Sequence, residues 1–166
     1  MTLPLPVYAG RTPLAELQTA ELFVVMSLRL WVAAHRDPTS VALGWRTGFD
    51  AAGLDDAGRD AFDALFRTVA ATASRSLDVR CPRCGELGED EGRLLQLLSL
   101  LQRRRPGEAA AILSDWMPNA ARRLAFVAAQ GFAVSLLEGG LAIPLRHAEA
   151  GSVVRAGADR GLALVQ

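Results

Sequence analysis

The sequence predicts an all-α fold, a single irregular bundle of five or six helices with one Cys-Pro-Arg-Cys-Gly loop between two long helices. Alanine and leucine dominate the 166 residues, and aromatic residues make up only 6%, a composition that favours helix over sheet. Apolar residues recur every three or four positions over long stretches, which is the spacing of one helix face. Prolines and glycines divide these stretches, as expected for helices joined by short linkers.

Composition and charge narrow the classes of function. Apolar residues make up 51% of the chain and charged residues only 22%, which excludes a mainly disordered protein. The 18 basic residues, all arginine, balance 18 acidic ones, so no overall field attracts nucleic acid or an anionic membrane. Arginine as the sole basic residue, beside abundant alanine and glycine, indicates a GC-rich bacterial genome.

The sequence predicts neither a secretory leader nor a membrane span. Residues 1–10 lack the basic start and apolar run of a signal peptide. The most apolar stretch, residues 22–34, contains Arg29 and is shorter than the ~20 residues that a bilayer requires. Two cysteines are too few for a disulfide framework. We therefore expect a cytoplasmic protein with reduced thiols and no membrane partner.

Caps and helix breakers divide the chain into an arm, a bundle domain and a tail. Residues 1–11 lack periodicity and predict an extended arm, residues 12–140 predict the bundle, and residues 141–166 are weakly patterned, as in a tail or docked arm. Within the bundle, Thr, Asp and Pro open helices and Gly ends them. The expected helices cover residues 12–35, 41–52, 55–77, 89–105, 107–117 and 118–137.

Three of these helices have informative faces. In the first helix one arc, expected to face solvent or the rim of the bundle, carries the polar residues Gln18, Glu21, Arg29, His35 and Arg36. The helix over residues 89–105 has leucine on almost every side, which predicts a central position. The last helix has a face of small residues that another helix can approach closely, formed by Ala128, Gly131 and Ser135.

Several catalytic signatures are absent from the sequence. Without lysine there is neither a phosphate-loop lysine nor a Schiff-base lysine. The chain contains no Gly-x-Gly-x-x-Gly, Gly-x-Ser-x-Gly or His-Glu-x-x-His motif. Only two histidines are present, His35 and His147, so a histidine-rich metal centre is excluded within one chain. The sequence therefore favours a non-enzymatic role.

The pair Cys81 and Cys84 carries the one specific chemical hypothesis. Two cysteines separated by two residues can bind one tetrahedral metal ion or close a small disulfide ring. With Pro82 after the first cysteine and Gly85 after the second, the loop resembles the metal-binding knuckle of rubredoxins and zinc ribbons. The resemblance covers five residues and implies zinc as the cofactor. Those folds carry two knuckles, whereas this chain has one.

Three alternatives account for the absence of a second cysteine pair. His35 or His147, alone or with a carboxylate, completes the site within the chain, and we take Cys81, Cys84 and His35 as the candidate metal ligands. Alternatively, two copies each donate one cysteine pair across a twofold axis, giving four thiolates around one zinc ion. In the third case the loop holds no metal and is purely structural, with cysteines that behave as small apolar residues.

A thiol-redox role is the alternative. Arg80 and Arg83 flank the cysteines and would lower a thiol pKa, favouring the reactive thiolate. The Cys-Pro-x-Cys motif is similar to the active site of thioredoxins and glutaredoxins, although those proteins begin a helix at the first cysteine. The helical alkylhydroperoxidase-like reductases place a glutamate before the pair and a histidine after it. This chain has Asp78 before the pair and no such histidine, so that proton relay is missing.

The function hypothesis that follows is a bacterial helical interaction or regulatory protein, non-enzymatic, with a zinc-binding or structural cysteine loop. Its expected partner is another protein or a second copy of the chain. The alternative is a small thiol-redox protein acting through Cys81 and Cys84. A nucleic-acid regulator is a third hypothesis, suggested by Arg103, Arg104 and Arg105. Three arginines at a helix C-terminus are better explained by the negative end of the helix dipole.

Overall fold

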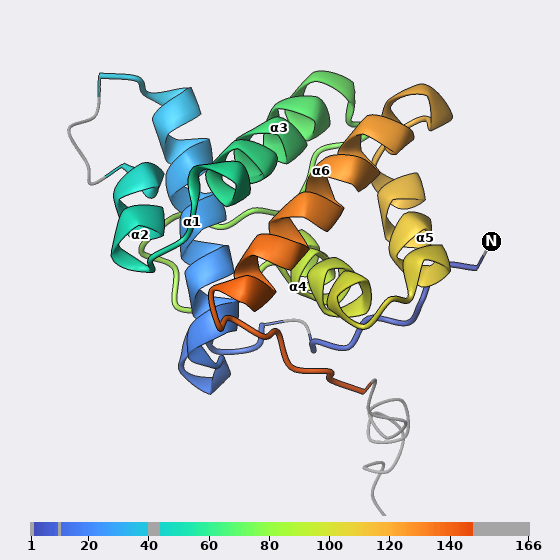
Figure 1. Ribbon diagram of the computed structural model, residues 1–166, viewed down its shortest axis with the longest axis horizontal. Coiled ribbons are helices and arrows are strands. Elements are labelled where there is room, and N and C mark those ends of the chain that lie inside the picture. The colour runs from blue at the N-terminus through green and yellow to red at the C-terminus, as the bar shows by residue number, and fades with distance from the viewer. Residues whose placement is uncertain (1, 10, 40–43, 148–166) are drawn as a thin grey trace, which may run out of the picture.

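The computed structural model describes residues 2–9, 11–39 and 44–147. Over these residues the chain forms six α-helices and one short 3-10 turn, with no strand, so the all-α prediction is confirmed (Figure 1). In chain order the helices are α1 (Thr19–Arg36), α2 (Trp45–Ala51), α3 (Asp56–Thr72), α4 (Glu89–Gln102), α5 (Pro106–Trp116) and α6 (Asn119–Glu138).

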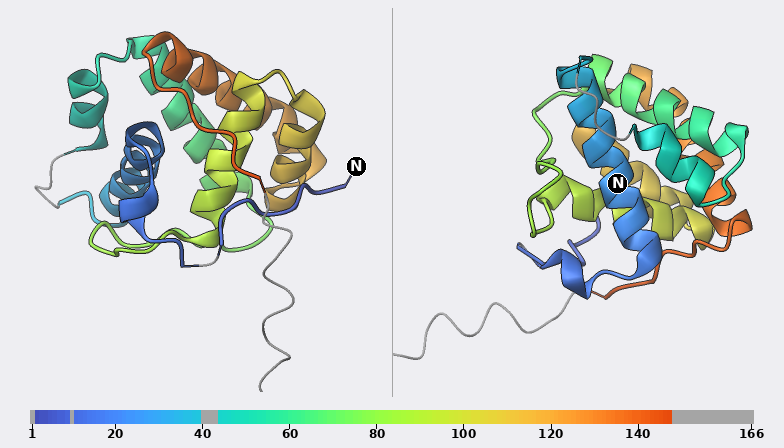
Figure 2. Two further views of the ribbon diagram at one scale, coloured as in Figure 1. Left: turned by 90° about the horizontal axis from the view of Figure 1, so that it is seen from below. Right: turned by 90° about the vertical axis from the view of Figure 1, so that its left-hand side faces the viewer.

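Helix α4 lies at the centre of the bundle, as its leucine pattern predicts. Every residue from 90 to 100 is buried, polar residues included. Helices α5 and α6 pack against it, and the N-terminal arm runs along another side (Figures 1 and 2). Gln96 of α4 donates a hydrogen bond to the carbonyl of Leu5 at 2.8 Å. The polar residues Arg93 and Gln96 of α4 thus bind the arm and are shielded from water.

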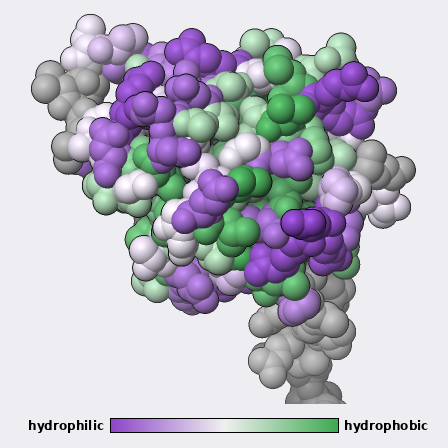
Figure 3. Space-filling model, in the orientation of Figure 1, coloured by the Kyte–Doolittle hydropathy of each residue, from purple (hydrophilic) through white to green (hydrophobic). Residues whose placement is uncertain are grey.

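Helices α3 and α6 form the largest helix–helix contact of the bundle. Gly58 of α3 permits it, because a Cβ at that position would lie 2.0 Å from the Ser135 hydroxyl oxygen of α6. Phe62 and Phe132 meet edge to face between the two helices, with ring centroids 5.1 Å apart. The predicted small-residue face of α6 is confirmed as the side that α3 approaches. The other side of α6 lies at the surface and carries exposed apolar residues (Figure 3).

The first helix begins later than the sequence predicts. The Thr12 hydroxyl donates back to the carbonyl of Ala9 at 2.7 Å instead of capping a helix that follows. A 3-10 turn, Leu14–Glu16, comes next, and Leu17 is extended with ψ 142°. The α-helix then starts at Thr19, where Glu21 accepts the backbone N–H of Gln18. Proline at position 13 therefore opens only the short turn.

Three other predicted boundaries differ from the structure. The helix expected over residues 89–105 is α4, which ends at Gln102. Helix α3 ends at Thr72, so Ala73 and Leu77, which continue its apolar spacing, lie in the following loop. The short helix expected over residues 41–52 is α2, which begins at Trp45, while residues 40–43 lie outside the described residues. The spacing of apolar residues alone cannot show where a helix ends, because residues of the following loop can pack on the same core.

Residues 141–147 dock against the bundle. Ile143 is fully buried, and its N–H donates to the Gln102 side-chain oxygen at 2.8 Å. Arg103 in turn donates to the carbonyl of Ile143. The first part of the weakly patterned tail is therefore a docked arm, and the remainder, residues 148–166, lies outside the described residues.

Candidate functional site

The two cysteines lie in the connection between α3 and α4, at the surface. Cys81 is exposed and Cys84 is partly buried, and both thiols are free. The backbone between them forms a turn in which the N–H of Cys84 donates to the carbonyl of Cys81 at 3.0 Å. Two further backbone hydrogen bonds attach the connection to the start of the chain, from Leu14 N–H to the carbonyl of Gly85 and from Leu87 N–H to the carbonyl of Thr12.

The buried guanidinium group of Arg29 donates hydrogen bonds to the backbone of this turn. Its Nη1 donates to the carbonyl oxygen of Cys81 at 3.2 Å and to that of Cys84 at 2.6 Å. Its Nη2 donates to the carbonyl of Glu86 at 2.7 Å. Because these carbonyls converge on one buried cation, the shape of the loop is set by α1, which lies far from it in the sequence.

Glu91 of α4 holds Arg29 in place. The two groups form a bidentate pair, with Nε to Oε1 at 2.7 Å and Nη2 to Oε2 at 2.8 Å, and neither side chain is exposed. Glu91 also accepts the N–H groups of Gly88 and Arg80. Burial opposes the charged form of Arg29, but the hydrogen bonds with Glu91 outweigh it and the pKa of Arg29 is raised.

The prediction that the polar arc of the first helix faces solvent is wrong for two residues. Arg29 is only 1% exposed and Glu21 is 0% exposed, while His35 and Arg36 of the same arc are exposed. Each buried member has a specific partner of opposite charge, Glu91 for Arg29 and Arg146 for Glu21. A buried charge requires such compensation.

The two thiols differ in their electrostatic surroundings. A hydrogen bond from the Cys84 thiol is the largest influence that lowers the pKa of Cys81, followed by the backbone N–H of Arg83. The charge of Arg29 acts in the same direction. The hydrogen bond with Cys81 raises the pKa of Cys84. The exposed thiol is thus the one that ionises more readily.

The structure does not bring His35 together with the cysteines. Its Nδ1 lies 2.8 Å from the carbonyl oxygen of Trp31, and its ring stacks on the Trp31 indole with centroids 3.7 Å apart. It lines a groove of about 350 Å³ together with Trp31, Phe66 and Trp116. Among the described residues, no group of three or more His, Cys, Asp or Glu side chains is arranged to hold a metal ion. The predicted set Cys81, Cys84 and His35 is therefore not assembled within the described chain.

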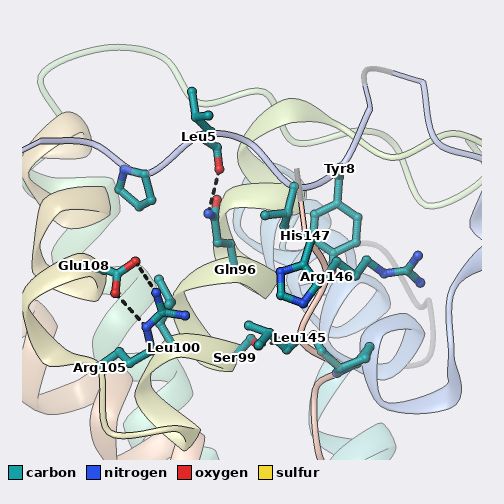
Figure 4. Close-up of a pocket in the computed structure, with 13 residues that line it drawn as sticks. Leu5, Tyr8, Gln96, Ser99, Leu100, Arg105, Glu108, Leu145, Arg146 and His147 are labelled. Atoms are coloured by element: carbon teal, nitrogen blue, oxygen red, sulfur yellow. Dashed lines mark hydrogen bonds and ion pairs between the residues drawn. The ribbon is translucent and has the colours of Figure 1, made fainter. Parts of the chain in front are cut away.

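His147 lies in a different place. It borders a small pocket of about 170 Å³ between the N-terminal arm, α4 and the docked segment over residues 141–147 (Figure 4). Tyr8 and Arg146 line the same pocket, and both hydrogen-bond to Glu21. This cluster joins the two ends of the described chain and contains no thiol, so the structure gives His147 no role in the cysteine site.

The arrangement offers a pair of neighbouring thiols on a loop with a fixed backbone. Two thiolates can contribute half of a tetrahedral zinc site, or can form and break a disulfide. Arg29 and Glu91, which shape the loop, were missed by sequence reasoning. One signal was available for Arg29, the only charged residue within the apolar residues 22–34. Comparisons with protein-family models, curated protein sequences and solved structures found no match to this chain.

Proposed function

We propose that this protein is a non-enzymatic helical interaction protein that presents Cys81 and Cys84 as half of a tetrahedral zinc site. The remaining ligands come from a second protein molecule. One observation carries the proposal: both thiols lie at the surface on a turn whose carbonyl groups are held by the buried Arg29. The loop therefore keeps its shape through the protein itself and is ready to accept a metal ion.

The donor set suits zinc but is incomplete. Structural zinc sites take four ligands, and thiolate is among the commonest. The described residues supply two thiols and no third ligand beside them. The pKa of Cys81 is lowered by the Cys84 thiol and then by the backbone N–H groups of Arg83 and Cys84, as expected in a knuckle that stabilises thiolate. The positive charge of Arg29 would offset part of the negative charge that four thiolates place around one Zn²⁺ ion.

Zinc binding by the purified, untagged chain tests this proposal. After equilibration with zinc and desalting, metal content and molar mass are measured together. Half a zinc ion per chain in a zinc-dependent dimer would identify a second copy as the source of the missing ligands. One zinc ion per monomer, with water in the two open positions, would indicate that another protein supplies the missing ligands. Zinc retention equal to that of the Cys81→Ser, Cys84→Ser double variant would contradict the proposal.

A matched control distinguishes loss of a thiol from a change elsewhere in the loop. Arg83 lies between the cysteines and is exposed, with no hydrogen bond or ion pair from its side chain to another described residue. Arg83→Ser should therefore keep the zinc content, whereas Cys81→Ser should lower it strongly. Substitution of cobalt for zinc gives a second readout, because its visible spectrum reports how many thiolates bind the metal.

A thiol–disulfide exchange protein is the second candidate, favoured by the exposure of Cys81 beside the more protected Cys84. The Cys81 thiolate would attack one sulfur of a substrate disulfide, forming a mixed disulfide and releasing the other sulfur as a thiolate. The Cys84 thiolate would then displace the second substrate sulfur. The substrate disulfide is thereby reduced to two thiols, and Cys81 and Cys84 are oxidised to a disulfide.

Trapping distinguishes this candidate from the zinc site. With metal-free protein and a small-molecule disulfide, Cys84→Ser should accumulate the mixed disulfide at Cys81, whereas Cys81→Ser should react slowly. Mass spectrometry of the intact chain measures both. Equal, slow reaction of the two variants would remove the redox candidate and leave the zinc proposal in place.

A further inference from the structure

Helix α6 carries a stripe of apolar side chains on its outer face. The exposed fractions are 63% for Leu124, 62% for Val127, 50% for Val134 and 49% for Leu137. Figure 3 shows hydrophobic surface gathered over this helix, which crosses the face in view. Four exposed aliphatic residues at helical spacing on one helix typically mark an interaction surface.

The stripe is symmetric about the middle of the helix. Positions at equal distances on either side of the Gln130–Gly131 peptide bond carry matching residues: valine at 127 and 134, and leucine at 124 and 137. One step further out, the pair is Arg123 and Glu138, which have opposite charge. Two antiparallel copies of such a helix, related by a twofold axis at this bond, place each residue level with its counterpart in the second copy.

The charged residues at the ends of the stripe specify the direction of the partner helix. Arg123 and Glu138 are exposed, and neither side chain has a hydrogen bond or ion pair with another residue that the structure describes. In an antiparallel pair Arg123 of one copy lies at the same end as Glu138 of the other, so that two ion pairs flank the apolar centre. A parallel pair would place like charges together, which is unfavourable.

We infer that α6 is the interface of an antiparallel, twofold-symmetric homodimer. A single pair of helices buries less than the ~800 Å² per partner of a standard-size interface, so association should be weak and depend on concentration. The cysteine loop lies on the opposite side of the molecule from α6 (Figure 2). The inference is therefore independent of the proposed zinc site, and association through α6 should persist in the presence of a chelator.

Sedimentation velocity with EDTA present, over about a hundredfold range of protein concentration, measures this association directly. The native chain should shift from monomer to dimer. A Val127→Asp, Val134→Asp double variant should remain monomeric, because each substitution acts twice in a symmetric interface. Leu5→Asp is the control, since Leu5 is 73% exposed on the N-terminal arm, away from α6. A native chain that stays monomeric throughout, or a double variant that still dimerises, would overturn the inference.

Exchange of the charges tests the antiparallel arrangement. Arg123→Glu or Glu138→Arg alone should weaken dimerisation about tenfold, because each creates two like-charge pairs. The combined variant should recover affinity to within about threefold of the native chain. All four residues of the stripe and both charged residues lie at the surface, so circular dichroism should show unchanged folding. A combined variant as weak as the singles would refute the pairing.

A lipid surface is the competing occupant for this face. By length and composition alone, α6 is long and apolar enough to cross a membrane, although its inner side is part of the core. Flotation with neutral phosphatidylcholine vesicles distinguishes the two cases. Recovery of the chain with the vesicles, lost on Val127→Asp, Val134→Asp, would overturn the homodimer. No recovery, together with dimerisation in solution, supports it.

Discussion

Two buried glutamates occupy equivalent positions in α4 and α1. Glu91 and Glu21 are each the third residue of their helix, each is 0% exposed, and each accepts the N–H of the residue before the helix. Each also binds an arginine through both carboxylate oxygens, Arg29 for Glu91 and Arg146 for Glu21. In both helices, therefore, a glutamate that caps the N-terminus is buried and paired with an arginine.

The two arginine–glutamate clusters differ in whether water can reach the arginine when its glutamate partner is removed. Arg29 comes from within a helix, has no exposed side-chain surface, and also holds the cysteine loop. Arg146 comes from the docked C-terminal segment, and its side chain is 30% exposed. Water can therefore replace the partner of Arg146 but not that of Arg29. The comparison indicates that one glutamate shapes the candidate site, whereas the other fastens the ends of the described chain.

Substitution of Arg29 by methionine should give the largest effect. It leaves the Glu91 carboxylate buried without its cation and removes the donor to the loop carbonyls. Breaking a buried pair in this way costs about 3–5 kcal/mol. Urea unfolding measures the loss. The control is Arg67→Met, because Arg67 is 62% exposed and its ion pair with Asp63 lies at the surface, where such pairs contribute about 0–1 kcal/mol. A loss as small as the control's would contradict the distinction between the clusters.

The central helix and the cap of α3 were predictable from the sequence, because local rules determine them. Leucine on almost every side of residues 89–105 leaves no face for water, which places α4 in the middle. Asp55 before α3 is a cap by residue type and position, and its side chain does accept the N–H of Gly58. Neither inference needs information from elsewhere in the chain.

The buried charges were not predictable, because their partners are remote in the sequence. Glu91 lies 62 residues from Arg29, and Arg146 lies 125 residues from Glu21. Periodicity assigns a charged residue to the solvent side of a helix, and only the tertiary fold can provide the opposite charge that makes burial acceptable. The position of His35 relative to the cysteines was undetermined for the same reason, since it depends on the path of helices between them.

Removal of the charge at Glu21 should have the second largest effect and should depend on pH. Burial raises the pKa of Glu21, but hydrogen bonds from Arg146 and Tyr8 outweigh it, so the folded pKa lies below the ordinary value of 4.5. Its contribution is complete above that value and is lost as pH falls through the folded pKa. Glu21→Gln should therefore lower the unfolding free energy by about 2 kcal/mol at neutral pH.

Urea unfolding between about pH 7 and pH 3 tests this expectation. The difference between the native chain and Glu21→Gln should shrink on acidification below about pH 4.5. Glu108→Gln is the control, because Glu108 pairs with Arg105 at the surface. A difference that stays constant as pH falls would show that packing, and not charge, accounts for the effect of Glu21→Gln.

Substitution of Arg146 by alanine should cost less, about 1 kcal/mol, because its side chain is partly exposed and water can reach the vacated position. The effect should be local. Hydrogen exchange measured by mass spectrometry should become faster in residues 2–9 and 141–147 and stay unchanged in α4. Faster exchange across the cysteine loop instead would mean that the two clusters are coupled.

The smallest effect is expected for Tyr8→Phe. The hydroxyl of Tyr8 donates to Glu21 at 2.6 Å, but Glu21 keeps its bonds from Arg146 and the Gln18 backbone, so the loss should be about 0.5 kcal/mol.

The same tyrosine provides a titration test. Burial, and then the neighbouring Glu21 carboxylate, raise the pKa of Tyr8 far above its usual value. Because Tyr8 is the single tyrosine of the chain, absorbance near 295 nm reports it alone. The folded native protein should show no tyrosinate at about pH 11. In Glu21→Gln, Tyr8 should ionise at lower pH, because the Glu21 carboxylate no longer opposes the negative charge of the tyrosinate. Ionisation of the native chain near pH 10 while it remains folded would show that the arm does not cover Glu21 in solution.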